Sequence, residues 1–207
     1  MEFNQLVKLL EQDQSIFKPR KTEGRRERFN QIIQRQIQDY IKNGSKGDLS
    51  LPGTPITSLP DNLKYVGGIL DLSNTLITSL PAGLKVGGCC LDLSRTPITT
   101  LPDNLTVVGN LYVDRTQITS LPGNLKVGGL YIHDTQIASL PDNLSVDELD
   151  AHSTLIQEFP DSLKIRNWLD IRNTPLAEKY RKGVLTLAQR LEQFKKTYPG
   201  VNGQIYL

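Results

Sequence analysis

The sequence of 207 residues lacks several features that would assign it to a class of protein at once. It contains only two cysteines, the neighbours Cys89 and Cys90, which cannot form a disulfide framework and so favour a reducing, cytoplasmic environment. It has no run of about 18 apolar residues, so no membrane-spanning helix is predicted. Its first residues, MEFNQLVKLLEQDQ, lack the apolar segment of a secretory signal. These absences predict a cytoplasmic protein without a membrane anchor.

The formal net charge of +2 hides an uneven distribution of charge. Residues 1–47 contain ten Lys and Arg against six Asp and Glu, and residues 175–207 contain six against two. Residues 48–174 contain eight against fourteen. An acidic middle therefore lies between two basic ends, a pattern that concerns partners more than it concerns the fold.

A unit of about 20 residues occurs seven times along the middle of the chain. Its consensus is L-x-L-x-x-T-x-I-x-x-L-P-x-x-L-x-V-G-G, and successive units begin 21, 21, 20, 19, 19 and 20 residues apart. The leading L-x-L predicts a short parallel strand, and one unit alone cannot bury its apolar side chains, so the units must stack. The predicted strands begin at Leu49, Leu70, Leu91, Leu111, Leu130, Leu149 and Leu169. In the second unit, the predicted inward residues are Leu70, Leu72, Ile77, Leu80, Leu84 and Val86.

Proline and glycine recur at fixed positions of the repeat. A proline follows the last leucine in six units, where it ends strand pairing and starts an extended return segment. The Val-Gly-Gly elements at 66–68, 86–88 and 127–129 are predicted to let the chain turn tightly into the next strand. They do not resemble a nucleotide-binding loop, because no Lys-Ser follows them and no helix begins there.

These units resemble the short leucine-rich repeat proteins of bacteriophages and bacteria, whose pattern is LPDNLKVGG followed by LDLSNT. The closing segments NTPLAEKY and PGVNGQIYL resemble the end of such phage proteins. The similarity covers about residues 48–176 and implies a leucine-rich repeat solenoid. We expect a parallel β-sheet of about seven short strands with helical N- and C-terminal caps over its exposed ends. The return segments are too short for helices, so the convex side is expected to be loop-like. The resemblance also implies a phage-encoded protein that acts inside a bacterial host cell.

The chain departs from this pattern at one position of every unit. The usual asparagine is replaced by threonine, whose hydroxyl can also bond to neighbouring backbone, so we expect a ladder of threonines. These residues are Thr54, Thr75, Thr96, Thr116, Thr135, Thr154 and Thr174.

The two ends of the chain are predicted to cap the stack. We divide the sequence into an N-terminal helical cap with a basic segment (1–47), the repeats (48–174), and a C-terminal helical cap with a final strand (175–207). Deleting residues 1–43 is expected to expose apolar surface of the first repeat. An amphipathic helix is expected over 2–12. A second helix is expected over 24–42, and it ends at Asn43-Gly44. One of its faces is apolar and is formed by Phe29, Ile32, Ile33, Ile37, Tyr40 and Ile41.

At the other end, Thr174 and Pro175 read as the N-cap and first residue of a helix. Leu185, Leu187, Leu191 and Phe194 indicate another helix that runs to Tyr198-Pro199-Gly200, and GQIYL is expected to form a final strand.

The N-terminal cap contains a basic segment that could bind phosphates or an acidic protein surface. No aromatic residues are interleaved with it, so binding to single-stranded nucleic acid is not expected. An alternative function rests on this segment: a structural component of the virion that docks through it to a larger assembly. The segment comprises Lys18, Arg20, Lys21, Arg25, Arg26 and Arg28.

The side chains beside the buried leucines point outward onto the predicted concave sheet and form columns. Tyr112 and Tyr131 stand in one column between two pairs of aspartates, and exposed aromatic residues among charges are typical of a binding face. The alternative is that these exposed positions vary among polar residues without a binding role. The predicted protein-binding residues are Asp71, Asp92, Tyr112, Asp114, Tyr131, His133, Asp150, His152 and Asp170.

The aspartate pairs place like charges on neighbouring strands, which destabilises the sheet unless Arg95, Arg115, Arg172 or a basic partner offsets them. We therefore expect a monomer that binds a protein with a basic surface. Its partner would be a host or phage protein, such as a component of host defence.

Metal binding and cysteine catalysis are the other chemistries that these residue types suggest. His133, His152 and Asp114 could bind zinc, but strands hold ligands in a row rather than at tetrahedral corners, so neither a metal nor another cofactor is expected. Cys89-Cys90 could supply a nucleophile. Bacterial ubiquitin ligases join similar repeats to a catalytic cysteine domain, whereas only about 33 residues without cysteine follow the last strand here. The sequence therefore predicts a non-enzymatic protein.

Overall fold

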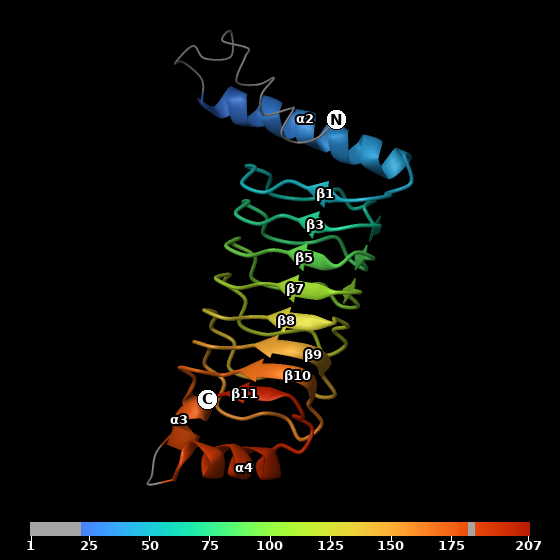
Figure 1. Ribbon diagram of the computed structural model, residues 1–207. Helices are drawn as coiled ribbons and strands as arrows, with labels where there is room; N and C mark the ends of the chain where they lie inside the picture. The colour runs from blue at the N-terminus through green and yellow to red at the C-terminus, as the bar shows by residue number, and fades with distance from the viewer. Residues whose placement is uncertain (1–21, 182–184) are drawn as a thin grey trace.

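The computed structural model describes residues 22–181 and 185–207, with side chains described from residue 27 onward within the first helix. Eight parallel strands form one sheet in the order β1-β3-β5-β7-β8-β9-β10-β11. Figure 1 shows these strands stacked one above another along the molecule, with helices at both ends. The strands are β1 (Leu49–Ser50), β3 (Leu70–Asp71), β5 (Cys90–Asp92), β7 (Asn110–Tyr112), β8 (Gly129–Tyr131), β9 (Ser145–Asp150), β10 (Lys164–Asp170) and β11 (Gln204–Tyr206).

The register of the sheet confirms the predicted repeat. Each leading leucine is paired with the leading leucine of the next unit, from Leu49 with Leu70 through to Leu149 with Leu169. The predicted final strand is also present, because Leu169 of β10 is paired with Ile205 of β11. Between Lys42 and Pro175 the chain contains no helix, as expected for return segments of this length.

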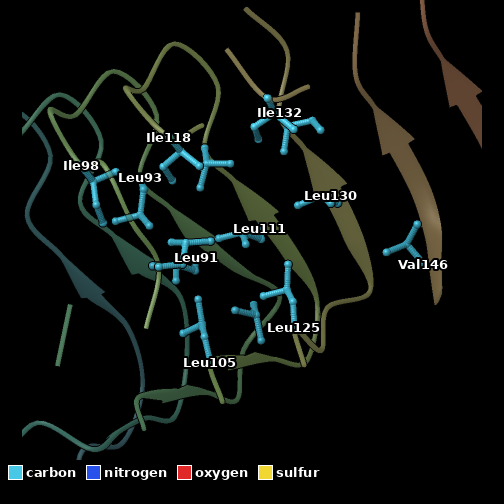
Figure 2. Close-up of a cluster of buried hydrophobic side chains, with 14 of the residues drawn as sticks. Leu91, Leu93, Ile98, Leu105, Leu111, Ile118, Leu125, Leu130, Ile132 and Val146 are labelled. Carbon is cyan, nitrogen blue, oxygen red and sulfur yellow. The ribbon is translucent and has the colours of Figure 1, made fainter. Parts of the chain in front are cut away.

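The core runs through the inside of the stack as one continuous cluster. The six inward residues predicted for the second unit are all buried, with at most 8% of their surface exposed. Figure 2 shows how side chains from neighbouring units meet, such as Leu91 with Leu111 and Ile98 with Ile118. Because each side chain covers its counterpart in the next unit, no unit is stable by itself.

A second, three-stranded sheet, in the order β2-β4-β6, joins the first units and was not predicted. Its strands are β2 (Tyr65–Val66), β4 (Lys85–Val86) and β6 (Thr106–Val107). The glycines that follow bring neighbouring backbones close together: a Cβ on Gly88 would lie 2.2 Å from the carbonyl carbon of Gly68, and one on Gly109 would lie 2.1 Å from the oxygen of Cys89.

The tight turn of each unit lies elsewhere than predicted. Positive φ angles occur just before the repeated threonine, as at Asn74 (57°), Arg95 (55°) and Asp134 (55°). The Val-Gly-Gly glycines have no positive φ, so close packing rather than turn conformation requires them.

The predicted threonine ladder is confirmed in all seven units. Each hydroxyl donates to the carbonyl oxygen three residues earlier, at 2.6–2.7 Å, and each threonine is buried. Thr54, for example, donates to Leu51 at 2.7 Å. The hydroxyl thus provides a close hydrogen-bond donor for the carbonyl group three residues earlier in each unit.

Helix α2 (Thr22–Lys42) covers the first repeat (Figure 1). Ile33 and Ile37 are fully buried, whereas Ile32, which was predicted on the same face, is 38% exposed. The side-chain amides of Gln38 and Asn62 bond to each other at 3.1–3.2 Å and tie the helix to that repeat. The helix ends as predicted, with Gly44 at a φ of 83°. The expected helix over 2–12 lies outside the described residues.

Helices α3 (Pro175–Arg181) and α4 (Leu187–Thr197) cover the other end of the stack. The Thr174 hydroxyl accepts a bond from the Ala177 amide at 3.0 Å, which confirms Thr174 as the N-cap. On α4 only Phe194 is fully buried, in edge contact with Phe159 and Tyr180. The predicted helix is confirmed, but it begins at Leu187, so Leu185 precedes it; these two side chains are 63% and 41% exposed.

None of the described helices is both long enough and apolar enough to cross a lipid bilayer.

Candidate functional site

The candidate site is the outer face of the eight-stranded sheet, which we call the sheet face. It consists of the side chains that follow each leading leucine by one and three residues, together with those of the residues that directly precede each leading leucine. Four aspartates occupy the first of these columns, and each accepts a bond from the backbone amide two residues later. Ser73 donates to Asp71 at 3.0 Å, and Ser94 donates to Asp92 at 2.8 Å by its amide and 2.6 Å by its hydroxyl. These carboxylates therefore stabilise the turn after each strand.

The predicted repulsion between neighbouring aspartates is offset in only one of the two pairs. Arg172 donates to both carboxylate oxygens of Asp170, the shortest contact being 2.6 Å. Burial opposes ionisation of Asp170, but the hydrogen bonds from Arg172 outweigh it and lower the pKa of this carboxyl. Arg115 pairs instead with Asp134 at 3.2 Å, and Arg95 forms no ion pair with any described residue.

The two histidines lie on neighbouring units, as predicted, with their rings stacked at 4.5 Å. His152 Nδ1 lies 2.6 Å from Asp150 Oδ1, within hydrogen-bond distance. His133 lies between two acids: its Nε2 is 3.5 Å from Asp114, and its Nδ1 is 3.5 Å from Asp150. Burial raises the pKa of Asp114, and the charge of Asp92 adds to this effect while His133 opposes it.

Among the described residues, His133, Asp150 and His152 form the one group whose ligand atoms lie close enough together to suggest a metal site. An imidazole binds a metal ion in the plane of its ring. The planes of His133 and His152 differ by only 10°, so their lone pairs do not converge on one point. Sharing an ion would require one ring to rotate, which agrees with the argument that strands place ligands in a row.

Aromatic side chains form a ladder at the centre of the sheet face. The rings of Tyr112 and Tyr131 stack at 4.4 Å, and Trp168 meets Tyr131 edge-on at 5.9 Å. The Tyr131 hydroxyl donates to Glu148 at 2.5 Å, and the Asn110 amide donates to the Tyr112 hydroxyl at 3.3 Å. Burial, together with the bond to Glu148, raises the pKa of Tyr131. The rings are thus held in place while remaining partly exposed.

No protein-family model and no curated protein matches this sequence. Among solved structures, the leucine-rich repeat domain of a Shigella effector aligns with 100% of this chain and 98% of its own, with 20% identity and a TM-score of 0.57. A leucine-rich repeat protein of Leptospira interrogans aligns with 78% of this chain and 54% of its own, with 15% identity and a TM-score of 0.36. The first similarity agrees with the strand order and register. The fold is a leucine-rich repeat solenoid.

Sequence reasoning missed several residues of the leucine-rich repeat sheet face. Trp168, Glu148 and Asn110 occupy the column directly before the leading leucines, which the repeat alignment locates, but they were not among the predicted binding residues. Their contacts with Tyr112 and Tyr131 join residues of different units, and the sequence gives no measure of such distances.

Cys89 and Cys90 lie at the edge of the sheet face, with their sulfur atoms 3.8 Å apart. Burial and the neighbouring Cys89 raise the pKa of Cys90 to about 12. At neutral pH this thiol is protonated and a poor nucleophile, so the Cys90 side chain does not suggest catalysis.

The basic segment is described only in part. Arg28 is exposed on α2. The structure does not describe the side chains of Arg25 and Arg26, nor the residues Lys18, Arg20 and Lys21.

Proposed function

We propose that this leucine-rich repeat protein is a non-enzymatic binding module whose protein partner lies on the sheet face. The observation that carries the proposal is the aromatic ladder of Tyr112, Tyr131 and Trp168. Large rings that are already fixed by hydrogen bonds lose little conformational freedom when they are buried, which makes them suitable anchors for a partner. The predicted acidic residues surround this ladder on both sides.

The finer form of the proposal rests on the resemblance of the repeats to those of phage proteins. In that form the protein is a phage-encoded accessory factor that binds a host or phage protein, such as a component of host defence. The aspartates would increase the rate of association with a basic surface and make that rate sensitive to salt.

The test compares three tagged baits in a pull-down from phage-infected cells, with quantitative mass spectrometry. The baits are the wild type, Tyr112→Ala/Tyr131→Ala, and Thr119→Ala/Ser139→Ala as a matched control on the return segments of the same two repeats. Both control side chains are exposed. We expect a partner that the wild type and the control retain and the tyrosine variant loses. Each tyrosine is expected to contribute about 2 kcal/mol, or about 30-fold in affinity.

A second variant, Tyr112→Phe/Tyr131→Phe, separates loss of the rings from loss of their hydroxyl groups and guards against misfolding. It keeps the stacked rings and is expected to retain the partner. A partner that binds all baits equally would exclude the sheet face. Recovery of the protein in purified phage particles would instead favour the structural role in the virion.

A further inference from the structure

Some acids of the sheet face contact a basic side chain and others do not, and this difference indicates how a partner is oriented. We propose that the partner places arginine or lysine side chains over the half of the sheet face formed by β3, β5 and β7, beside the open ring of Tyr112. This inference rests on the proposed function and specifies the chemistry of the partner.

The first half of the sheet face contains acids without a cation. Asp71 and Asp92 are register partners on β3 and β5, so their backbones are about 4.8 Å apart and their side chains leave the same face of the sheet. Both accept bonds only from neutral groups, namely the serine amides and the Ser94 hydroxyl. Neither forms an ion pair with any residue that the structure describes. Two neighbouring negative charges therefore face solvent without compensation.

In the second half of the sheet face the acids already have basic side-chain partners. Asp170 is held by Arg172, which also lies over the ring of Tyr206 at 5.6 Å. Asp150 lies between His133 and His152, at 3.5 Å and 2.6 Å. A cation arriving there would have to compete with groups that are already in contact with the carboxylates.

The aromatic ladder gives the first half a second recognition element. One face of the Tyr112 ring is covered by Tyr131. Its other face is turned toward β5, where Asp92 is the register partner of Tyr112. A guanidinium group placed there would lie over an aromatic face and contact a carboxylate at the same time, an arrangement for which arginine is better suited than lysine.

The probe for this inference is a short synthetic peptide of alternating glycine, serine and arginine, titrated into ¹⁵N-labelled full-length protein. The four amides that donate to the aspartates act as reporters. Ser73 and Ser94 report on the first half of the sheet face, and His152 and Arg172 report on the second. We expect saturating shifts at Ser73 and Ser94 that are several times larger than those at His152 and Arg172. The same peptide with citrulline in place of arginine has the same shape without the charge and is expected to cause no saturating shift.

Two double variants separate a local site from the effect of net charge. Asp71→Asn/Asp92→Asn preserves the oxygen that accepts the serine amides and is expected to weaken binding about tenfold. Asp103→Asn/Asp142→Asn removes the same amount of charge from exposed return segments and is expected to leave binding within about twofold.

Equal shifts at all four reporters, equal binding of the citrulline peptide, or equal weakening by both variants would overturn the inference. If the captured partner still depended on Tyr112 and Tyr131, the proposed function would stand and only the position of the cations would be wrong. If the peptide bound at Ser73 and Ser94 while the captured partner ignored the tyrosines, the proposed function would fail instead.

Discussion

The two halves of the sheet face have similar repeats but opposite electrostatic character. On β3 and β5, Asp71 and Asp92 accept bonds from the turn of their own unit. Neither forms an ion pair with a basic side chain among the described residues. On β9 and β10, Asp150 and Asp170 hold the same turn and also contact a histidine or an arginine. The same residue type at the same repeat position is therefore free to attract a partner in one half and already in contact with a basic side chain in the other.

The difference comes from the residue two positions after each aspartate. It is serine in the first half, at Ser73 and Ser94, and histidine or arginine in the second, at His152 and Arg172. A short hydroxyl leaves the charge of the carboxylate intact, whereas a longer cationic or imidazole side chain folds back onto it. The residue two positions after each aspartate therefore decides whether the carboxylate has a basic side-chain partner within its own unit.

The largest expected effect compares the same substitution in the two halves. Asp170→Asn is expected to lower the free energy of unfolding by about 2 kcal/mol, because it removes charge-assisted bonds to a carboxylate that is only 5% exposed. Asp92→Asn should change it by less than about 0.5 kcal/mol, because the amide oxygen still accepts the Ser94 bonds. Urea unfolding at neutral pH measures both, and equal losses would mean that the halves do not differ in this way.

A smaller effect is expected at the boundary between the halves, in the aromatic ladder. Tyr131→Phe should lower the free energy of unfolding by about 1 kcal/mol, because it leaves Glu148 without the hydroxyl that donates to it at 2.5 Å. Tyr112→Phe removes only a longer, 3.3 Å bond from Asn110 and should have less than half that effect. Thermal unfolding of both variants checks the order, and a reversed order would contradict it.

The subtlest expected effect is a difference in pH dependence between two buried acids. The pKa of Asp170 is lowered from 3.8, so its contribution to stability is present above that value and is lost as the pH falls through the folded-state pKa. The pKa of Asp114 is raised from 3.8 by burial and the charge of Asp92, against the opposing charges of His133 and Arg115. The ionisation of Asp114 therefore reduces stability as the pH rises above 3.8.

The free energy of unfolding of Asp170→Asn should approach that of the wild type as the pH falls toward about 3. The free energy of unfolding of Asp114→Asn should rise relative to that of the wild type as the pH rises toward about 6. Urea unfolding across this range gives both differences. Slopes of the same sign for the two variants would contradict the opposite pKa shifts.

Much of the fold could be predicted because repetition averages out local ambiguity. Seven aligned copies of L-x-L place seven strands of the main sheet and their register, and the columns of outward residues follow from the alternation of side chains along each strand. The threonine ladder was predictable for the same reason, since its hydrogen bond joins residues three apart within one unit. One prediction failed where the pattern stops: Leu185 was expected in the helix that follows the repeats, but α4 begins only at Leu187.

The sequence by itself determined the solenoid, its inward leucines, and which residues share a column of the sheet face, because these follow from a period and an alternation. The tertiary structure alone decided which side chains in those columns contact one another. The bond from Tyr131 to Glu148, the position of His133 between two carboxylates, and the choice of Arg172 for Asp170 depend on side-chain rotamers and on the spacing of adjacent units. Rotamers are selected by packing across strands, and a sequence read along one chain contains no such distances.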